Sequence, residues 1–478
     1  MNLLFATSEL FPLIKTGGLA DVSQSLPLAL RQAGVDVTLV LPAYRSVLAQ
    51  LPEPLARWPV NDAFVPAETV LLENRLPGSD LRLLLVQPGD LFDREGGPYS
   101  DAKGLDWPDN ADRFAQFCRV VVALLAGRCG AEPFSAGHFD VVHCNDWQTG
   151  LVPALLALEP VPVRSIFTIH NLAYQGLFSR AVFERLALPE AWWHHDRLEF
   201  YGNFSFLKAG IVYADAITTV SPTYAREILE EPLACGMGGL LQYHRHKLQG
   251  ILNGADYSLW NPATDSHLRF HYDVDSLPEK LHNKLDLQRS LGLRLGKSIP
   301  LLGVVSRLVY QKGADWIIDC MQRLQGEKLQ WVVLGTGDRQ HEQQLLALAR
   351  AVPKQIAVTI GYDEAMAHRI EAAADLFVMP SRYEPCGLNQ IYSLRYGTLP
   401  LVRATGGLAD TVTDCTDGFA YRGDTASDLE QCIRRAIGYF SKSKTWEKMQ
   451  RNAMGQRFDW QQSAQAYLAL YQHRDSRN

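Results

Sequence analysis

The hexapeptide TGGLAD occurs twice in the chain, at Thr16–Asp21 and Thr405–Asp410, and its paired glycines could take part in binding an anion. In each copy a Thr-Gly-Gly step leads from a strand-like run into a helical pattern, so we expect unpaired backbone N–H groups there. Such N–H groups and the helix dipole together attract anions. An isolated copy would be interpreted as a glycine turn, whereas two copies at matched positions favour one anionic ligand shared by two domains.

Three cations accompany these glycines. Lys15 directly precedes the first copy, and Arg307 and Lys312 follow the first strand-like run of the second half, in SRLVYQKG. Ligands of open α/β sheets bind beyond the carboxyl ends of the strands, which is where these side chains fall. Three cations and two helix starts could hold a diphosphate without a metal ion. No GxGxxG follows the first strand, which argues against a dinucleotide cofactor.

The elements that position these residues form a repeated pattern. Short apolar runs alternate with helical patterns, which predicts α/β folding with parallel, doubly wound sheets. This alternation of strand-like and helical segments begins with a strand-like run over 2–7. It starts again after about residue 250, with a strand-like run over 300–308. We therefore predict two Rossmann-like domains, over 1–251 and 252–457. A final amphipathic helix over 458–478 is expected to pack back on the N-terminal domain.

The composition is typical of a globular protein, with 47% hydrophobic and 21% charged residues and a net charge of −6. No cluster of Lys and Arg could follow a phosphate backbone, so we expect neither nucleic acid nor an acidic membrane as a partner. No apolar run approaches the ~18 residues of a membrane span, and no signal peptide precedes the first strand. The eight cysteines are scattered without a disulfide pattern, which fits a reducing cytoplasm.

Seven motifs carry a resemblance to a known family. In chain order they are KTGGLADV, HCNDWQTGLVP, TIHNLAYQG, GILNGAD, SRLVYQKG, PSRYEPCGLNQIYSLRYGTLP and TGGLADTV, and the chain resembles bacterial glycogen synthases from residue 1 to about 475. The resemblance implies the GT-B glycosyltransferase fold, in which an acceptor-side and a donor-side domain face a deep cleft. It also implies retaining transfer of glucose from ADP-glucose to the non-reducing end of an α-1,4-glucan such as glycogen. ADP is released, and neither a metal nor an organic cofactor is expected.

The resemblance assigns the charged residues to the donor. Lys15, with the backbone of Gly17 and Gly18, resembles the contact to the distal phosphate and the glucose. Arg307 and Lys312 resemble the clamp that neutralises the departing ADP, because breaking the sugar–phosphate bond loads negative charge onto the leaving oxygen.

Further residues resemble the groups around the sugar. Glu384 resembles the carboxylate that lies against the donor glucose, where positive charge develops in the transition state. His170 and Asn171 resemble residues placed against the glucose and its anomeric carbon. Asp146 and Trp147 resemble the pair at the sugar and acceptor side, although Trp147 could equally lie in the core. The catalytic candidates are thus Glu384, His170, Arg307, Lys312, Lys15 and Asp146.

The resemblance also implies contacts of a less specific kind. Tyr362 resembles a ring that stacks on the base, and Tyr174 lies on the acceptor side. Other contacts to ADP-glucose are implied for Asp21, Asn253, Cys386, Gly387, Leu388, Thr405, Gly406 and Gly407.

Two positions depart from the pattern of related enzymes. Tyr392 stands where many of them have a second Glu, so ribose recognition cannot rest on a carboxylate there. Asn389 offers an amide in place of a hydroxyl next to the phosphates. Two alternative functions are a non-catalytic sugar or nucleotide sensor on the same scaffold and a phosphorylase with pyridoxal phosphate. The intact set of charged candidates argues against the sensor, and the sequence does not predict the oligomeric state.

Overall fold

The computed structural model describes residues 1–130 and 134–473. It divides into two compact units. The first comprises Met1–Val220, Ala225–Leu252 and the chain from Trp460, and the second comprises Ser221–Tyr224 and Asn253–Asp459. The predicted domain starts at residues 252 and 458 lie within two residues of the points where the chain passes between the units.

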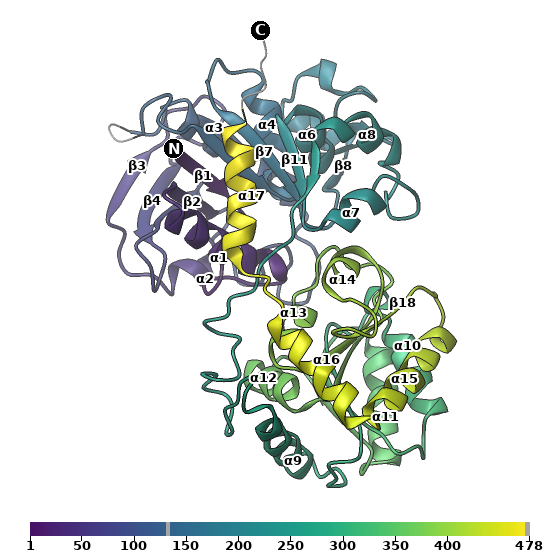
Figure 1. The fold of residues 1–478 in the computed structure, drawn as a ribbon. Coiled ribbons are helices and arrows are strands. Elements are labelled where there is room, and N and C mark those ends of the chain that lie inside the picture. The colour runs from purple at the N-terminus through teal and green to yellow at the C-terminus, as the bar shows by residue number, and fades with distance from the viewer. Residues whose placement is uncertain (131–133, 474–478) are drawn as a thin grey trace. The chain divides into compact units, whose positions relative to one another are not determined.

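A nine-stranded sheet forms the centre of the first unit, in the order β12-β11-β7-β6-β1-β2-β5-β4-β3 (Figure 1). Its strands are β1 (Asn2–Ala6), β2 (Asp36–Pro42), β3 (Ala56–Pro59), β4 (Val70–Arg75), β5 (Arg82–Gln87), β6 (Val141–Asn145), β7 (Arg164–Ile169), β11 (Ala216–Thr219) and β12 (Leu248–Gly250). Neighbouring strands are parallel except at the β5-β4-β3 edge. The prediction of a parallel sheet is wrong at this edge, because the short link from β4 to β5 leaves no room for a crossover helix.

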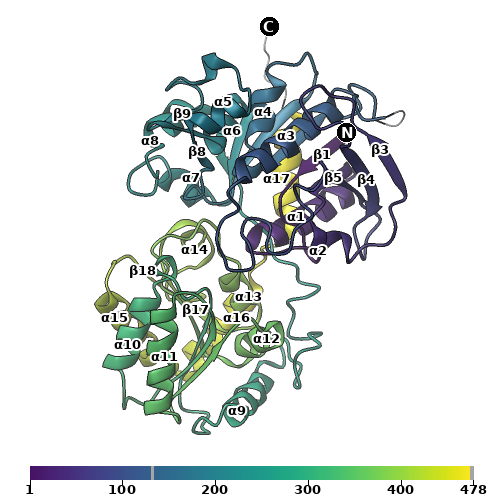
Figure 2. The ribbon, with the colours of Figure 1, turned by 180° about the vertical axis from the view of Figure 1, so that it is seen from behind.

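Helices cover both faces of this sheet, as the alternating pattern predicts. On one face α1 (Gly18–Gln32) packs against the last helix, α17 (Trp460–Gln472), and on the other α4 (Leu151–Leu156) packs against α3 (Asn110–Leu125) and α6 (Phe206–Tyr213) (Figures 1 and 2). From β1 the chain first adds β2 and β5 on one side and later adds β6 and β7 on the other side. The carboxyl ends of β1 and its neighbour β6 therefore mark the topological switch point of the sheet.

A buried polar contact fixes α17 to the first unit. The hydroxyl of Tyr471 lies 2.7 Å from Nδ1 of His143, and Nε2 of His143 lies 2.6 Å from Oγ1 of Thr168 on the neighbouring strand. Burial lowers the pKa of His143 to about 3, so the imidazole is neutral and bridges two hydroxyl groups.

A second, smaller sheet in the first unit was not predicted. Its strands, in the order β8-β10-β9, cover Leu177–Ser179, Asn203–Ser205 and Glu199–Phe200. Strands of two or three residues are too short to show an alternating pattern, which is why periodicity did not predict them. The short helices of this unit are α2 (Arg45–Leu48), α5 (Arg180–Arg185), α7 (Pro222–Glu227, at the passage between the units) and α8 (Gly238–Tyr243).

The second unit is built on a six-stranded parallel sheet in the order β15-β14-β13-β16-β17-β18. Numbered from β13, this is the Rossmann order 3-2-1-4-5-6, with its switch point between β13 and β16. The strands are β13 (Leu301–Val305), β14 (Gln330–Gly335), β15 (Ile356–Ile360), β16 (Leu376–Met379), β17 (Leu399–Arg403) and β18 (Phe419–Tyr421). The prediction of two Rossmann-like sheets is thereby confirmed.

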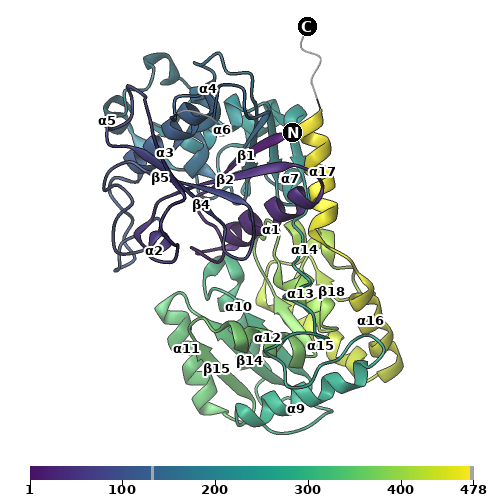
Figure 3. The same ribbon diagram turned by 90° about the vertical axis from the view of Figure 1, so that its left-hand side faces the viewer.

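Helices also cover both faces of the second sheet. α10 (Ala314–Arg323) packs against α11 (Arg339–Ala351) and α15 (Ala426–Phe440), and Figure 3 shows α11 beside the edge strand β15. The other helices are α9 (Lys280–Ser290), α12 (Glu364–Ala373), α13 (Asn389–Arg395), α14 (Gly406–Thr411) and α16 (Ser443–Gly455). None of the helices within the described ranges combines the length and the apolar character that crossing a bilayer requires.

Candidate active site

The loops that follow β13 and β16 meet at the switch point of the second sheet. Nζ of Lys312 lies 2.5 Å from Oε2 of Glu384, and the two side chains are only 19% and 7% exposed. Ser381 donates a second hydrogen bond to the same oxygen, at 2.9 Å. Because the switch point is where open α/β sheets bind ligands, two of the predicted catalytic residues are in contact at a position suited to a substrate.

Arg307 lies in the loop after β13 but in a different setting. Its guanidinium is exposed and donates a hydrogen bond to Oε1 of Gln311, at 3.2 Å. Gln311 in turn donates to the carbonyl of Tyr383, at 3.3 Å. The loop that carries Arg307 and the loop that carries Glu384 are therefore linked by side-chain bonds as well as by the ion pair.

The second TGGLAD copy packs against the backbone of the Glu384 loop. A Cβ atom on Gly406 would lie 1.8 Å from the Glu384 carbonyl oxygen, and one on Gly407 would lie 2.1 Å from that of Cys386, so neither position admits a side chain. The N–H of Gly407 donates to the carbonyl oxygens of Glu384 and Pro385. The prediction of unpaired N–H groups is thus wrong at Gly407, because the neighbouring loop uses this donor.

The residues between Glu384 and α13 are held by local contacts. Gly387 has a positive φ of 69°, which favours glycine, and Leu388 is the residue directly before α13. Burial raises the pKa of the Cys386 thiol to about 12, so it remains protonated and is not a nucleophile. The amide of Asn389 donates to the carbonyl of Val305, at 2.9 Å, and so ties α13 to the end of β13.

Three more of the predicted contacts lie in the second unit. Tyr362 follows β15, is 73% exposed and donates a hydrogen bond from its hydroxyl to Glu364, so its ring offers an open face. Asn253 is 6% exposed, and its Oδ1 accepts no hydrogen bond from the described residues. A buried acceptor without a donor costs free energy unless a ligand or water satisfies it. Thr405 is buried at the start of α14.

Tyr392 is part of the core. Its ring stacks on Trp260 at a centroid distance of 4.0 Å, and Trp260 stacks on His368 at 3.7 Å. His368 in turn forms an ion pair with the buried Asp265, at 2.7 Å. Tyr392 therefore positions α13 by packing.

In the first unit, the first TGGLAD copy differs from the second. It does not follow β1 directly as predicted, because the loop 7–17 lies between the strand and α1. A Cβ atom on Gly17 or Gly18 would meet no atom within 4 Å, so the space beside both glycines is open. Lys15 forms an ion pair with Asp21, Nζ to Oδ1 at 2.8 Å, on the first turn of α1. Only this copy leaves room for a ligand against its glycines.

Glu9 holds the loop of the first copy, and sequence reasoning missed it. Its carboxylate is 4% exposed. It accepts hydrogen bonds from the N–H of Thr16 (2.6 Å) and of Gly17 (3.1 Å) and from the hydroxyls of Thr16 (2.5 Å) and Tyr99 (2.7 Å). The N–H groups of Thr16 and Gly17 are therefore paired, contrary to the prediction. An acidic residue directly after a buried strand, in TSE, was the available signal.

His170 follows β7 in a defined tautomer. The amide nitrogen of Asn145 donates to the carbonyl of Ala6, at 3.0 Å, so its Oδ1 faces His170 Nε2, at 2.9 Å. Since Oδ1 can only accept, Nε2 carries the proton and Nδ1 keeps a lone pair. Burial lowers the pKa of His170 to about 3, so the ring is neutral.

Asp146 supports the backbone at His170. Its Oδ1 accepts the N–H of His170 at 2.7 Å. Burial raises the pKa of Asp146 to about 7 against the opposing effect of backbone bonds from His170 and Asn171, and the charge of Glu9 adds to the rise. Asp146 also has a φ of 56° and a ψ of −179°, a conformation that costs on the order of 1–3 kcal/mol for a residue with a side chain. Asp146 thus links the loops that follow β6 and β7.

The two acceptor-side candidates differ in setting. The Trp147 ring packs edge-on against Phe114 and Phe206, at centroid distances of 5.0 and 5.8 Å, and near Phe178, so it is mainly a packing residue. Tyr174 is 52% exposed. Of these two aromatic side chains, the Tyr174 ring is the more accessible to a ligand.

Comparison with known proteins identifies the family. A family profile described as "Starch synthase catalytic domain" matches residues 2–243, and one described as "Glycosyl transferases group 1" matches residues 292–454. A glycogen synthase of Cellvibrio japonicus is 48% identical over 98% of both chains. Glycogen synthase 2 of Nitrosococcus oceani is 46% identical over 98% of this chain and 97% of its own.

Solved structures agree with the sequence relatives. The catalytic domain of starch synthase IV from Arabidopsis thaliana superposes with a TM-score of 0.86 at 30% identity, over 98% of both chains. A sucrose-phosphate synthase from Thermosynechococcus elongatus superposes with a TM-score of 0.62 at 20% identity, which shows the shared fold alone. The chain therefore belongs to the glycogen synthase family, glycosyltransferases of the GT-B fold that act in glycogen synthesis.

Proposed function

We propose that this enzyme is a retaining glucosyltransferase that moves glucose from ADP-glucose to the non-reducing end of an α-1,4-glucan and releases ADP. The contact of Lys312 with Glu384 carries the proposal. It sets a cation suited to a leaving diphosphate beside a carboxylate suited to a sugar that gains positive charge. Starch synthase IV was solved bound to ADP and acarbose, which supports ADP as the nucleotide.

Each unit offers its own groups to the donor. Arg307 and Lys312 hold the diphosphate, and Lys15 reaches the distal phosphate while the open backbone at Gly17 and Gly18 lies against the sugar. The ring of Tyr362 stacks on the base. The same cations stabilise the leaving group, so the transfer needs neither a metal nor an organic cofactor.

The transfer takes place on one face of the sugar. The bond between C1 of glucose and the phosphate oxygen breaks, the acceptor's O4 bonds to C1 on the same side, and its proton passes to the departing phosphate oxygen. Lys312 stabilises the charge on that oxygen. Glu384 stabilises the positive charge that develops on the sugar ring, and the acceptor is an α-1,4-glucan such as glycogen.

A covalent intermediate would need a free carboxylate nucleophile on the opposite face. Neither acidic candidate suits that role. Glu384 is paired with Lys312 and Ser381, and Asp146 accepts the backbone N–H of His170 while burial raises its pKa to about 7. Asp146 is instead a positioning residue for His170, whose Nδ1 lone pair accepts a hydrogen bond from a sugar hydroxyl.

Nucleotide release from ADP-glucose and from UDP-glucose, with and without glycogen, tests the proposal. Glycogen-dependent release from ADP-glucose is expected. A strong preference for UDP-glucose would contradict only the assignment of adenine as the base. Nucleotide release that does not depend on glycogen would contradict the proposed glucan acceptor. No release from either donor would favour a sensor.

A further inference from the structure

Two histidines and an aspartate converge on one turn of the first unit. Nε2 of His195 lies 3.1 Å from Oδ1 of Asp196, and Nδ1 of His194 lies 3.6 Å from Oδ2 of the same carboxylate. One ligand atom from each side chain lies within 4.8 Å of the other two, and among the described residues no other such group of three was found. The two imidazole rings lie side by side, with centroids 4.1 Å apart.

The separation of His195 from Asp196 is suited to two ligands of one ion. Imidazole nitrogen and carboxylate oxygen bind Zn²⁺ at about 2.0–2.2 Å, which places neighbouring ligand atoms of a tetrahedral site about 3.3 Å apart. The distance from His195 Nε2 to Oδ1 of Asp196, 3.1 Å, is close to that value, and His194 Nδ1 lies 3.6 Å from the other carboxylate oxygen, Oδ2. Nδ1 of His194 accepts a long hydrogen bond, 3.3 Å, from the N–H of Asp196, so this nitrogen is unprotonated, and its lone pair would have to leave this bond to bind an ion.

Hydrogen bonds to backbone carbonyls stabilise the turn that carries the three side chains. The carbonyl of His194 accepts the N–H of Arg197 and of Glu199. Nζ of Lys208 donates to the carbonyls of His195 and Glu199, at 2.5 and 2.6 Å. The ligand atoms can therefore converge with only side-chain rotations, which lowers the entropic cost of binding.

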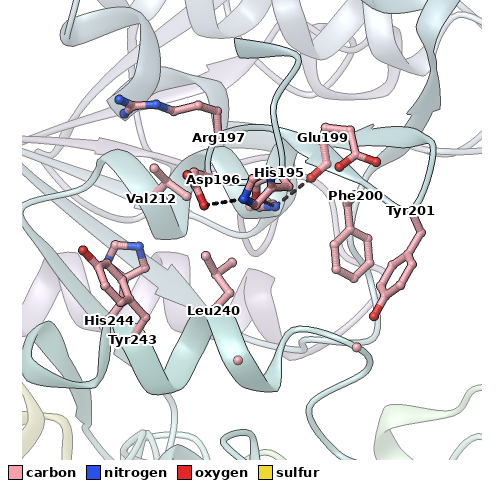
Figure 4. Close-up of a pocket in the computed structure, with 13 residues that line it drawn as sticks. His195, Asp196, Arg197, Glu199, Phe200, Tyr201, Val212, Leu240, Tyr243 and His244 are labelled. Carbon is pink, nitrogen blue, oxygen red and sulfur yellow. Dashed lines mark hydrogen bonds and ion pairs between the residues drawn. The ribbon is translucent and has the colours of Figure 1, made fainter. Parts of the chain in front are cut away.

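The turn borders a pocket of about 1030 Å³, shown in Figure 4, and His195 and Asp196 belong to its lining. His244 lines the same pocket but is not part of the group of three. Figure 4 shows His244 on a different element from the His195–Asp196 contact, which is drawn as a dashed line. An ion held by this contact would border the pocket and could bind a further oxygen or nitrogen ligand there.

We propose that His194, His195 and Asp196 form a binding site for a divalent transition-metal ion of the zinc, nickel or copper class, with its remaining coordination positions open. Imidazole suits these metals, whereas Mg²⁺ and Ca²⁺ prefer oxygen ligands. The proposed glucosyl transfer uses none of the three residues, so this ion is not a cofactor of that reaction.

Titration of the tag-free full chain with Co²⁺, followed by visible absorption, and with Zn²⁺, followed by calorimetry, tests the site. We expect one ion per chain at this site. His195→Ala and Asp196→Ala should each weaken binding by about tenfold or more, since even the loss of a residue behind a ligand costs about 10–100-fold. His244→Ala, a matched control in the same pocket, should bind as the wild type does.

All three side chains are more than half exposed, with 54%, 75% and 71% accessible, so their truncation does not open the core. Unchanged Zn²⁺ affinity in both the His195→Ala and Asp196→Ala variants would overturn the proposal. So would a wild type that binds neither ion, or binding lost in His244→Ala but kept in His195→Ala.

Discussion

Truncating Glu9 to alanine is expected to release the loop that carries Lys15. The buried carboxylate accepts four hydrogen bonds, two from the backbone N–H groups of Thr16 and Gly17 and two from hydroxyls. Each bond to a charged acceptor contributes about 1.5–3 kcal/mol. Because Thr16 and Gly17 are exposed and water can replace part of the loss, we expect local opening to become easier by about 3 kcal/mol, a factor on the order of 100.

Glu9→Gln should have a much smaller effect. Its carbonyl oxygen can keep the two backbone donors, and its NH₂ group can donate to the hydroxyls of Thr16 and Tyr99, which can turn to accept. The variant loses charge but keeps the pattern of bonds, so we expect a loss of about 1 kcal/mol and less than a tenfold change in opening.

Limited trypsin digestion measures this opening at one bond. Trypsin cuts after Lys15, and the N–H of that peptide bond is the Thr16 N–H that donates to Glu9 at 2.6 Å. When the loop recloses faster than it is cut, the cleavage rate follows the open population. Cleavage after Lys103, in an exposed loop, serves as an internal reference in the same digest. Glu95→Ala is the matched control, because that carboxylate is 87% exposed and makes only a 3.7 Å ion pair.

A Glu9→Ala variant that is cut after Lys15 no faster than the wild type, relative to Lys103, would refute the anchoring role. Equal acceleration in the glutamine and alanine variants would refute the bonding pattern assigned to glutamine. If the proposed donor contact of Lys15 holds, the alanine variant should also raise KM for ADP-glucose more than it lowers kcat.

Three further predictions concern charged side chains. Glu384→Gln keeps the side-chain volume but removes the charge beside Lys312, so kcat for transfer should fall by about 10²–10³-fold in steady-state assays, and an unchanged kcat would remove this carboxylate from the mechanism. Burial raises the pKa of Asp146 to about 7, so its stabilising contribution is complete below about pH 4 and is lost as the pH rises through 7. The Tm of Asp146→Asn should therefore gain on the wild type between pH 5 and 8, and a constant difference would contradict this. Burial opposes the charge of His368, but hydrogen bonds to Asp265 and to a glutamate raise its pKa from 6.5 to about 9. The charged ring therefore contributes about 3 kcal/mol to the free energy of unfolding below pH 6.5. Calorimetry should show that this contribution is lost as the pH rises to 9. His368→Gln should lack that loss.

Local rules predicted where two of the candidate residues lie in the fold. Lys312 and His170 follow strands that apolar periodicity marks clearly, and parallel sheets present their ligand sites at carboxyl ends. The placement of these residues just after β13 and β7 therefore required no knowledge of the tertiary structure.

Contacts that depend on strand order were not predictable. Lys312 and Glu384 are far apart in sequence and meet because β13 and β16 are neighbours, which only the complete sheet order determines. The two TGGLAD copies are identical in sequence, yet one leaves open space at Gly17 while the other packs Gly406 against a loop. What lies beside a glycine depends on the tertiary structure, which the local sequence does not determine. The tertiary structure therefore decides whether a glycine leaves room for a ligand or permits close packing.

The proposed reaction is tested most directly by following the fate of the glucose carbon. ADP-glucose labelled with ¹³C at C1 would be incubated with the enzyme and a maltooligosaccharide, and the products observed by NMR. We expect a new α-1,4-linked residue at the non-reducing end, with one ADP released for each residue added. A β-linked product, or free labelled glucose as the main product, would contradict it.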